Sequence, residues 1–241
     1  MTGIRFDHIA IAAHRLADAA PFLAGVLGGT PGEGGDSQEY RWGQWRYDGG
    51  GRLEVLEPQG ADGFLRRHLA ARGPGVHHVT FRVPSLRAVC ERAVAHGYRV
   101  VGYDDADPTW SEAFLHPKEA LGIVVQFAES RAPGGPRRPW TPPPAPPAVP
   151  PPVAVVGLRL RARSAARAHA QWSGVLEGEP GEGPGGTLLF RWPGSPMRLA
   201  VEIVADAEEG AVAIEIAAAH AVALPAGLVP ALGTVVRQVN A

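Results

Sequence analysis

Apolar and polar residues alternate along several short segments in the first 60 residues of the chain. This alternation predicts a strand over residues 4–12 and a hairpin of strands over 38–47 and 52–57. Between the first strand and the hairpin, the apolar residues follow a helical period and predict a helix over 15–27, which a glycine pair ends. The chain therefore begins with a strand, a helix and further strands.

The same order of elements follows a second time. A short helical connector over 64–69 leads to a strand over 76–83 and a helix over 85–96, for which Ser85 is the expected N-cap. Three further strands are predicted over 99–103, 112–116 and 122–128.

Proline dominates the next segment, residues 131–152, where neither a helix nor an inner strand is expected because proline lacks the backbone donor that both need. We predict a stiff, extended linker. Beyond it a third copy of the pattern begins at about residue 155, with a helix over 165–172 and strands over 187–192 and 198–204. The predicted domains are 1–130, made of modules at about 1–72 and 74–130, the linker, and a third module over 153–241.

Two of the predicted strands carry a histidine at the same place, and each has an oxygen-bearing partner at a similar distance downstream. Glu54 follows His8 by 46 residues, and Gln126 follows His78 by 48 residues. In the third copy the aligned positions hold Gly157 and Ala200, so we expect that module to lack ligands.

Repeated donors of this kind favour a metal site. If each module's sheet curves, ligands from its first and last strands meet on the concave side, and two paired modules bring all four around one point. Two imidazole nitrogens and two oxygens suit a divalent ion such as Co(II), Ni(II), Zn(II), Mn(II) or Fe(II). His77 is the alternative to His78, because a shift of one residue reverses the face of a strand.

Composition narrows the function classes. The 23 basic and 24 acidic residues give a net charge of −1, which does not favour a nucleic-acid or membrane partner, so a small-molecule substrate is expected. The single cysteine, Cys90, excludes an intrachain disulfide and is interpreted as a packed thiol in a helix. The chain lacks a basic start followed by a long apolar run, and no stretch reaches about 18 apolar residues, so a cytoplasmic location is expected.

At these residues the chain resembles the vicinal oxygen chelate superfamily, which includes glyoxalase I, methylmalonyl-CoA epimerase, fosfomycin-resistance proteins and extradiol dioxygenases. The resemblance covers about residues 4–129 and implies an α+β fold of paired βαβββ modules that form an open barrel, with metal ligands at His8, Glu54, His78 and Gln126; a homodimer is compatible with it. It rests on Asp7–Ile11, Leu53–Pro58, Gly75–Val79, His116–Lys118 and Gly122–Gln126.

The most similar pattern is that of methylmalonyl-CoA epimerase, but the order of two ligands differs. The epimerase pattern has the amide second and the carboxylate fourth, whereas here Glu54 is second and Gln126 is fourth. An amide cannot take a proton, so the fourth ligand cannot act as a base here. The extradiol dioxygenases have a glutamate last, which argues against that activity.

The resemblance implies stabilisation of an enolate by the metal, so a base is needed as well. Glu54 is our first candidate base, and Glu39, Glu112 and Asp104 are second choices. Substrate-binding candidates are His116 and Lys118, with Trp42, Trp45 and Trp110 as pocket walls.

We therefore expect a metal-dependent isomerase, epimerase or lyase that acts on a small 2-oxo acid, a thioester or a hemithioacetal. The alternative is a non-catalytic binding or resistance protein of the same fold, and an extradiol-type dioxygenase ranks below it. Residues 153–241 could also serve only as a dimerisation or lid element.

Overall fold

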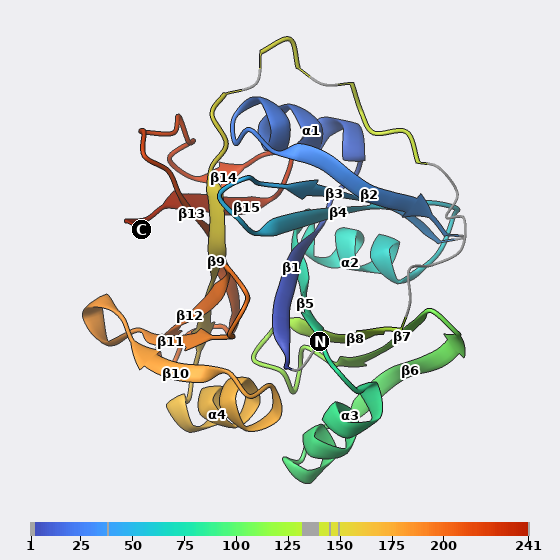
Figure 1. Ribbon diagram of the computed structural model, residues 1–241, viewed down its shortest axis with the longest axis vertical. Helices are drawn as coiled ribbons and strands as arrows, with labels where there is room; N and C mark the ends of the chain where they lie inside the picture. The colour runs from blue at the N-terminus through green and yellow to red at the C-terminus, as the bar shows by residue number, and fades with distance from the viewer. Residues whose placement is uncertain (1–2, 38, 132–139, 145, 149, 241) are drawn as a thin grey trace. The chain divides into compact units, whose positions relative to one another are not determined.

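The computed structural model describes residues 3–37, 39–131, 140–144, 146–148 and 150–240 (Figure 1). Strands β1 to β8 belong to one mixed sheet and β9 to β15 to a second. The predicted α+β class, with repeated βαβββ order, is confirmed. In the first sheet and its helices the bounds are β1 Arg5–Ala12, α1 Leu16–Gly25, β2 Thr30–Asp36, β3 Tyr40–Arg46, β4 Arg52–Pro58, α2 Phe64–Arg72, β5 Gly75–Arg82, α3 Leu86–Ala95, β6 Val100–Asp107, β7 Trp110–Leu115 and β8 Val124–Ser130.

The remaining elements follow the proline-rich segment. They are β9 Ala154–Ala162, α4 Ala165–His169, the π-helical η1 Ala170–Val175, β10 Glu179–Glu182, the 3-10 turn η2 Pro184–Gly186, β11 Leu188–Arg191, β12 Arg198–Ile203, β13 Gly210–Ala217, β14 Leu228–Val229 and β15 Thr234–Gln238.

The chain divides into two compact units, neither of them continuous in sequence. One unit consists of Met1–Asp7, His78–Gly135 and Gly157–Val212; the other consists of His8–His77, Pro136–Val156 and Ala213–Ala241. Each contains one of the two ligand-bearing modules predicted from the sequence.

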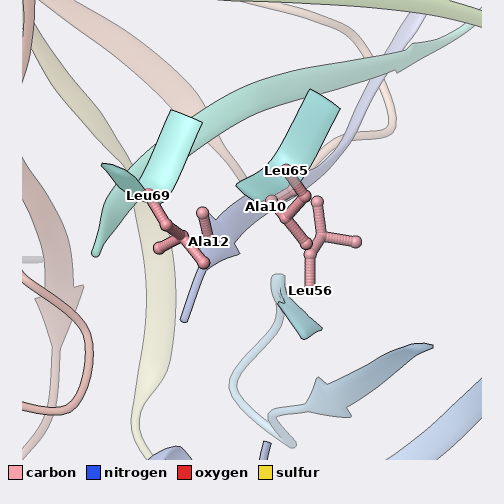
Figure 2. Close-up of a cluster of buried hydrophobic side chains, with 5 residues drawn as sticks. All are labelled: Ala10, Ala12, Leu56, Leu65 and Leu69. Atoms are coloured by element: carbon pink, nitrogen blue, oxygen red, sulfur yellow. The ribbon is translucent and has the colours of Figure 1, made fainter. Parts of the chain in front are cut away.

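In the unit that holds the first module, the strands lie in the order β2-β3-β4-β1, with β4 parallel to β1 and antiparallel to β3. Helix α1 covers one face. Helix α2 packs on the other face, where its Leu65 and Leu69 join Ala10, Ala12 and Leu56 in a buried apolar cluster (Figure 2). The even-numbered residues of β1 and β4 therefore face α2.

In the unit that holds the second module, the order is β5-β8-β7-β6, with β8 parallel to β5 and antiparallel to β7. Ser85 accepts a hydrogen bond from the Ala88 amide, which confirms the predicted N-cap of α3. The third module, with β10-β11-β12-β9 and α4, packs in the same unit. Its Trp172 and Trp192 contact Phe81 of β5, with ring centroids 6.1 and 4.7 Å away, so the two modules share an apolar core.

Several elements were not predicted. Strand β2, of sequence Thr-Pro-Gly-Glu-Gly-Gly-Asp, has no apolar alternation and pairs with β3 across a register shift. The helix expected over 165–172 ends its α-helical part at His169 and continues as the π-helical η1. Strands β13 to β15 fall within the predicted third module, 153–241, but follow its last predicted strand and were not expected; β13 is parallel to β15.

Part of the predicted linker lies outside the described residues, namely 132–139, 145 and 149. In its described part no residue is helical or in a strand. Trp140 packs edge to face on Trp45, with centroids 6.2 Å apart, and its indole nitrogen donates to the Gly32 carbonyl. A Cβ atom at Gly34 or Gly43 would lie 2.2 or 2.6 Å from the Trp140 ring, so the two glycines leave the space that this ring fills.

Candidate metal centre

The first pair of predicted ligands lies on adjacent parallel strands. Ala10 of β1 is the register partner of Glu54 in β4, so His8, two residues earlier, lies on the same face as Glu54. His8 is 3% exposed and Glu54 is 8% exposed. The His8 Nε2 atom is 3.6 Å from a Glu54 carboxylate oxygen.

Gln44 holds this carboxylate from the neighbouring strand. It is the register partner of Glu54 on β3, and its amide nitrogen donates to Glu54 Oε2 over 2.9 Å. Both side chains are buried. The carboxylate is therefore oriented by a neutral donor on one side and lies near an imidazole on the other.

The second pair repeats the geometry of the first. Thr80 of β5 is the register partner of Gln126 in β8, so His78 lies two residues before that position, as His8 does before Ala10. The Thr80 hydroxyl donates to Gln126 Oε1 over 2.6 Å, and Gln126 Nε2 donates to Glu112 Oε2 over 2.8 Å. His78 and Gln126 are buried, with 7% and 8% exposure.

His8 and Glu54 belong to one unit and His78 and Gln126 to the other, and each pair combines a buried imidazole with a buried oxygen donor. Two ligands at about 2.1 Å from one tetrahedral ion are about 3.4 Å apart, close to the 3.6 Å between His8 and Glu54. Imidazole and carboxylate are also donors that divalent transition metals accept. The His8–Glu54 pair therefore fits a divalent cation, and His78 and Gln126 stay predicted further ligands.

Two of the other predicted site residues form part of one polar network. Trp110 Nε1 donates to the same Glu112 oxygen that Gln126 contacts, over 2.9 Å. The Arg82 guanidinium lies over the Trp110 ring, 4.2 Å from its centroid, and its Nε is 3.7 Å from the Asp7 carboxylate. Trp110 and Glu112 are half-buried at the edge of the face that carries Gln126.

The remaining candidates are more dispersed. Glu39 is exposed in the turn before β3, five residues from Gln44, and Asp104 is exposed on β6 as the partner of Glu112. Trp42 is half-buried against the apolar cluster of Figure 2, whereas Trp45 is fully buried in the core.

His116 and Lys118 lie in the loop between β7 and β8, where the Lys118 amide donates to His116 Nδ1 over 3.2 Å. The same loop contacts the third module, because Arg167 donates to the Glu119 carbonyl over 3.0 Å. A substrate-binding role for His116 and Lys118 stays a prediction.

His77, the alternative to His78, contacts helix α2. Its ring lies 4.8 Å from that of His68 and 5.5 Å from that of Phe64. Burial, and in second place the charge of Arg72, lower the pKa of His68. The choice of His78 over His77 as a metal ligand stays a prediction.

Sequence reasoning missed Gln44 and Thr80. Both are buried polar residues on otherwise apolar strand segments, and both contact a predicted ligand directly. Their position could have been inferred from strand alternation, since Thr80 shares a face with His78. The pairing of Gln44 with Glu54 required the hairpin register.

Among the residues that the structure describes, no helix is long and apolar enough to cross a membrane.

Comparisons with known proteins agree with this fold. A family model described as Glyoxalase/Bleomycin resistance protein/Dioxygenase superfamily matches residues 7–114. The uncharacterised protein YqjC of Bacillus subtilis is 29% identical over 133 residues, which are 53% of this chain and 93% of that protein. Human mitochondrial methylmalonyl-CoA epimerase is 27% identical over 145 residues, which are 52% of this chain and 74% of that protein.

A solved structure extends the similarity beyond the family match. A hypothetical protein from Staphylococcus aureus superposes with a TM-score of 0.68 at 11% identity, covering 99% of this chain and 100% of that one, which shows a shared fold alone. The family match places residues 7–114 in a domain of the Glyoxalase/Bleomycin resistance protein/Dioxygenase superfamily, and the βαβββ order agrees with it, as the resemblance to vicinal oxygen chelate proteins predicted.

Proposed function

We propose that this protein is a metal-dependent enzyme that removes a proton from the carbon next to a carbonyl group of a small substrate. The buried His8–Glu54 pair carries the proposal, because its imidazole nitrogen and carboxylate oxygen lie 3.6 Å apart. His78 and Gln126 repeat the strand register of this pair in the other unit and are the proposed second pair of ligands. Gln126 is the proposed fourth ligand. An amide oxygen has two lone pairs, so Gln126 Oε1 can accept from Thr80 and still bind a cation.

A bound divalent ion would stabilise the negative charge that develops on the carbonyl oxygen of the substrate. The residues of the chain do the rest. Glu54 is the proposed base that takes up the proton, and the hydrogen bond from Gln44 orients its carboxylate. Ala10, Leu56 and the leucines of α2 form an apolar wall on the same face, which limits the access of water.

Among the expected substrate classes we favour an acyl thioester. The support is the similarity to a protein named methylmalonyl-CoA epimerase over about half of the chain. The exchange of Glu54 and Gln126 relative to the epimerase pattern leaves a 2-oxo acid or a hemithioacetal as further substrates to test.

The first experiment measures metal and chemistry separately. The purified protein is loaded with Co(II), Zn(II), Mn(II) or Ni(II), its bound metal is counted, and exchange of the α-proton of methylmalonyl-CoA is followed in D2O. We expect one tightly bound ion per chain and metal-dependent exchange. A protein that binds the thioester without exchanging its proton would support the alternative, a non-catalytic binding protein.

The adjacent histidines provide a matched pair of variants. His78→Ala should weaken metal binding about 100-fold or more, because it removes one of the four proposed ligands. His77→Ala should leave metal affinity unchanged, since His77 packs against His68 and Phe64. Equal losses in the two variants, or none in His78→Ala, would contradict the ligand set.

Glu54→Ala tests the base. We expect it to abolish proton exchange and also to weaken metal binding, because Glu54 is both base and ligand in the proposal. If neither quantity changes, Glu54 has no part in the function.

A further inference from the structure

Gln126 is the unusual member of the proposed ligand set, and its amide orientation is fixed by two hydrogen bonds. We infer that Glu112 is a positioning residue, which holds the amide nitrogen of Gln126 and thereby directs the amide oxygen toward the cation. The inference rests on the proposed metal site. Glu112 itself is not proposed to touch the metal or the substrate.

The strand order defines the two sides of Gln126. Strand β8 lies between β5 and β7, so one end of the amide faces each neighbour. The oxygen accepts from Thr80 on β5, the strand that also carries His78. The nitrogen donates to Glu112 on β7, which lies on the opposite side of Gln126. The oxygen of the amide therefore faces the histidine-bearing strand.

Glu112 enforces this orientation because a carboxylate can only accept hydrogen bonds. If the amide of Gln126 were reversed, two oxygens would meet where the nitrogen and oxygen are now 2.8 Å apart. A hydrogen bond to a charged acceptor is also stronger than a neutral one. Without Glu112 the two orientations of the amide would be much closer in free energy, and one of them presents N–H groups that a cation repels.

Glu112 is itself held in place. Trp110 Nε1 donates to the same carboxylate oxygen over 2.9 Å, and the Arg82 guanidinium packs 4.2 Å from the centroid of that indole. Asp7, 3.7 Å from Arg82 Nε, continues this chain of contacts. Three side chains, Trp110, Arg82 and Asp7, thus support the acceptor that Gln126 needs.

The first module provides an independent parallel in its own unit. There the proposed ligand is the carboxylate of Glu54, and the amide of Gln44 on the next strand donates a hydrogen bond to it. In the second module the proposed ligand is the amide of Gln126, and the carboxylate of Glu112 accepts a hydrogen bond from it. Each half therefore carries one carboxylate and one amide, with their positions exchanged.

The test measures the affinity of the full chain for Co(II) by titration and records the Co(II) absorption spectrum, which reports the number and type of ligands. Glu112→Ala should weaken binding by about 10–100-fold, as loss of a residue that orients a ligand usually does. Glu112→Gln retains an oxygen that can accept from both Gln126 and Trp110, so its affinity should stay within a few-fold of the unaltered protein.

A double-mutant cycle shows whether Glu112 acts through Gln126. In a Gln126→Ala background, Glu112→Ala should cause little further loss, because the residue it positions is absent. Glu129→Gln is the control, since Glu129 is a carboxylate on the adjacent strand that bonds the Leu86 amide instead, and its affinity should be unchanged. Each variant is checked for a folded state with cooperative thermal unfolding in the absence of metal.

The outcomes separate this inference from the proposed function. Unchanged affinity in Glu112→Ala, additive losses in the cycle, or a Glu112→Gln variant as weak as Glu112→Ala would overturn the inference while the metal site stands. If the unaltered protein binds no divalent ion, both fail.

Discussion

The ligand-bearing strands β1 and β4 and the ligand-free strands β9 and β12 share one backbone arrangement. Both pairs are parallel, with Ala10 opposite Glu54 in the first and Arg159 opposite Ala200 in the other. Two residues before those positions, β1 carries His8 and β9 carries Gly157. The two frames match position by position, yet only one carries donors for a metal.

The third module also differs from the first in its backbone, at the position where the first module has His8. Gly157 has a φ of +150°, and a Cβ atom there would lie 1.9 Å from the Arg198 carbonyl oxygen. On the same face Arg159 pairs with Glu202 over 3.0 Å. A glycine and an ion pair thus replace the metal ligands, and the close approach of the two strands leaves no space for an imidazole. The same strand register therefore occurs both with and without side chains that could bind a metal.

Placing a histidine in the third module should have the largest effect. Gly157→His should destabilise the protein by about 2–5 kcal/mol, through backbone strain and the clash with Arg198. Urea unfolding measures this change. Gly157→Ala introduces the backbone strain and the Cβ clash without the imidazole ring, and it should account for most of the loss. Wild-type stability in both variants would show that β9 can separate from β12.

A smaller effect sharpens the comparison of the two ligand-bearing modules. Each has a glutamate three residues after its second predicted ligand, and that carboxylate caps the earlier helix of its own module: Glu57 accepts from the Leu16 amide over 2.7 Å and Glu129 from the Leu86 amide over 2.8 Å. We expect Glu57→Gln and Glu129→Gln each to lose about 1 kcal/mol of stability in urea unfolding. A loss in one module only would show that the caps are not equivalent.

The cap on α3 also predicts a pH dependence. The hydrogen bond from the Leu86 amide, and then Arg131, lower the pKa of Glu129 against the opposing effect of burial. The stabilisation is therefore present above the unfolded-state pKa of about 4.3 and is lost as the pH falls through the lower folded-state pKa. The stability difference between wild type and Glu129→Gln should shrink below about pH 4; a constant difference from pH 7 to 3 would contradict it.

The smallest effect concerns Cys90, which occupies in α3 the place of Ala20 in α1, four residues after the capped leucine. Burial, and in second place Glu91, raise the pKa of the thiol to about 11. Reaction with iodoacetamide at pH 8 should be about 100-fold slower than that of free cysteine. Cys90→Ala should change stability by about 0.5 kcal/mol or less; rapid alkylation would mean that the thiol is activated.

Much of the fold could be predicted because alternation is strong where one face of a strand is buried. Strand β1 and helix α3 were found to within about a residue at either end. Strand β2 could not be found in this way, since its glycines and charged residues become a strand only by pairing with β3. Strand β13 was also missed, although Ile214 and Ile216 alternate with polar or small residues there.

The candidate site also has one part that the sequence predicts and another part that only the structure reveals. Repetition in the sequence led to the prediction of His78 rather than His77 and paired each histidine with a downstream oxygen donor, because spacing and alternation are local properties. Gln44, Thr80 and the role of Glu112 required the register of strands distant in sequence.

From the sequence alone came the repeated modules, the αβ order of their elements and the four donor residues, since these follow from hydrophobic periodicity and from chemical type. Only the tertiary structure decided that Gln126 donates to Glu112 and that Gln44 donates to Glu54. It also decided that the Arg198 carbonyl leaves no space for a side chain at Gly157. The physical reason is that a hydrogen-bond partner or a steric limit is set by which strands lie side by side and in what register, and one strand does not encode the position of its neighbour.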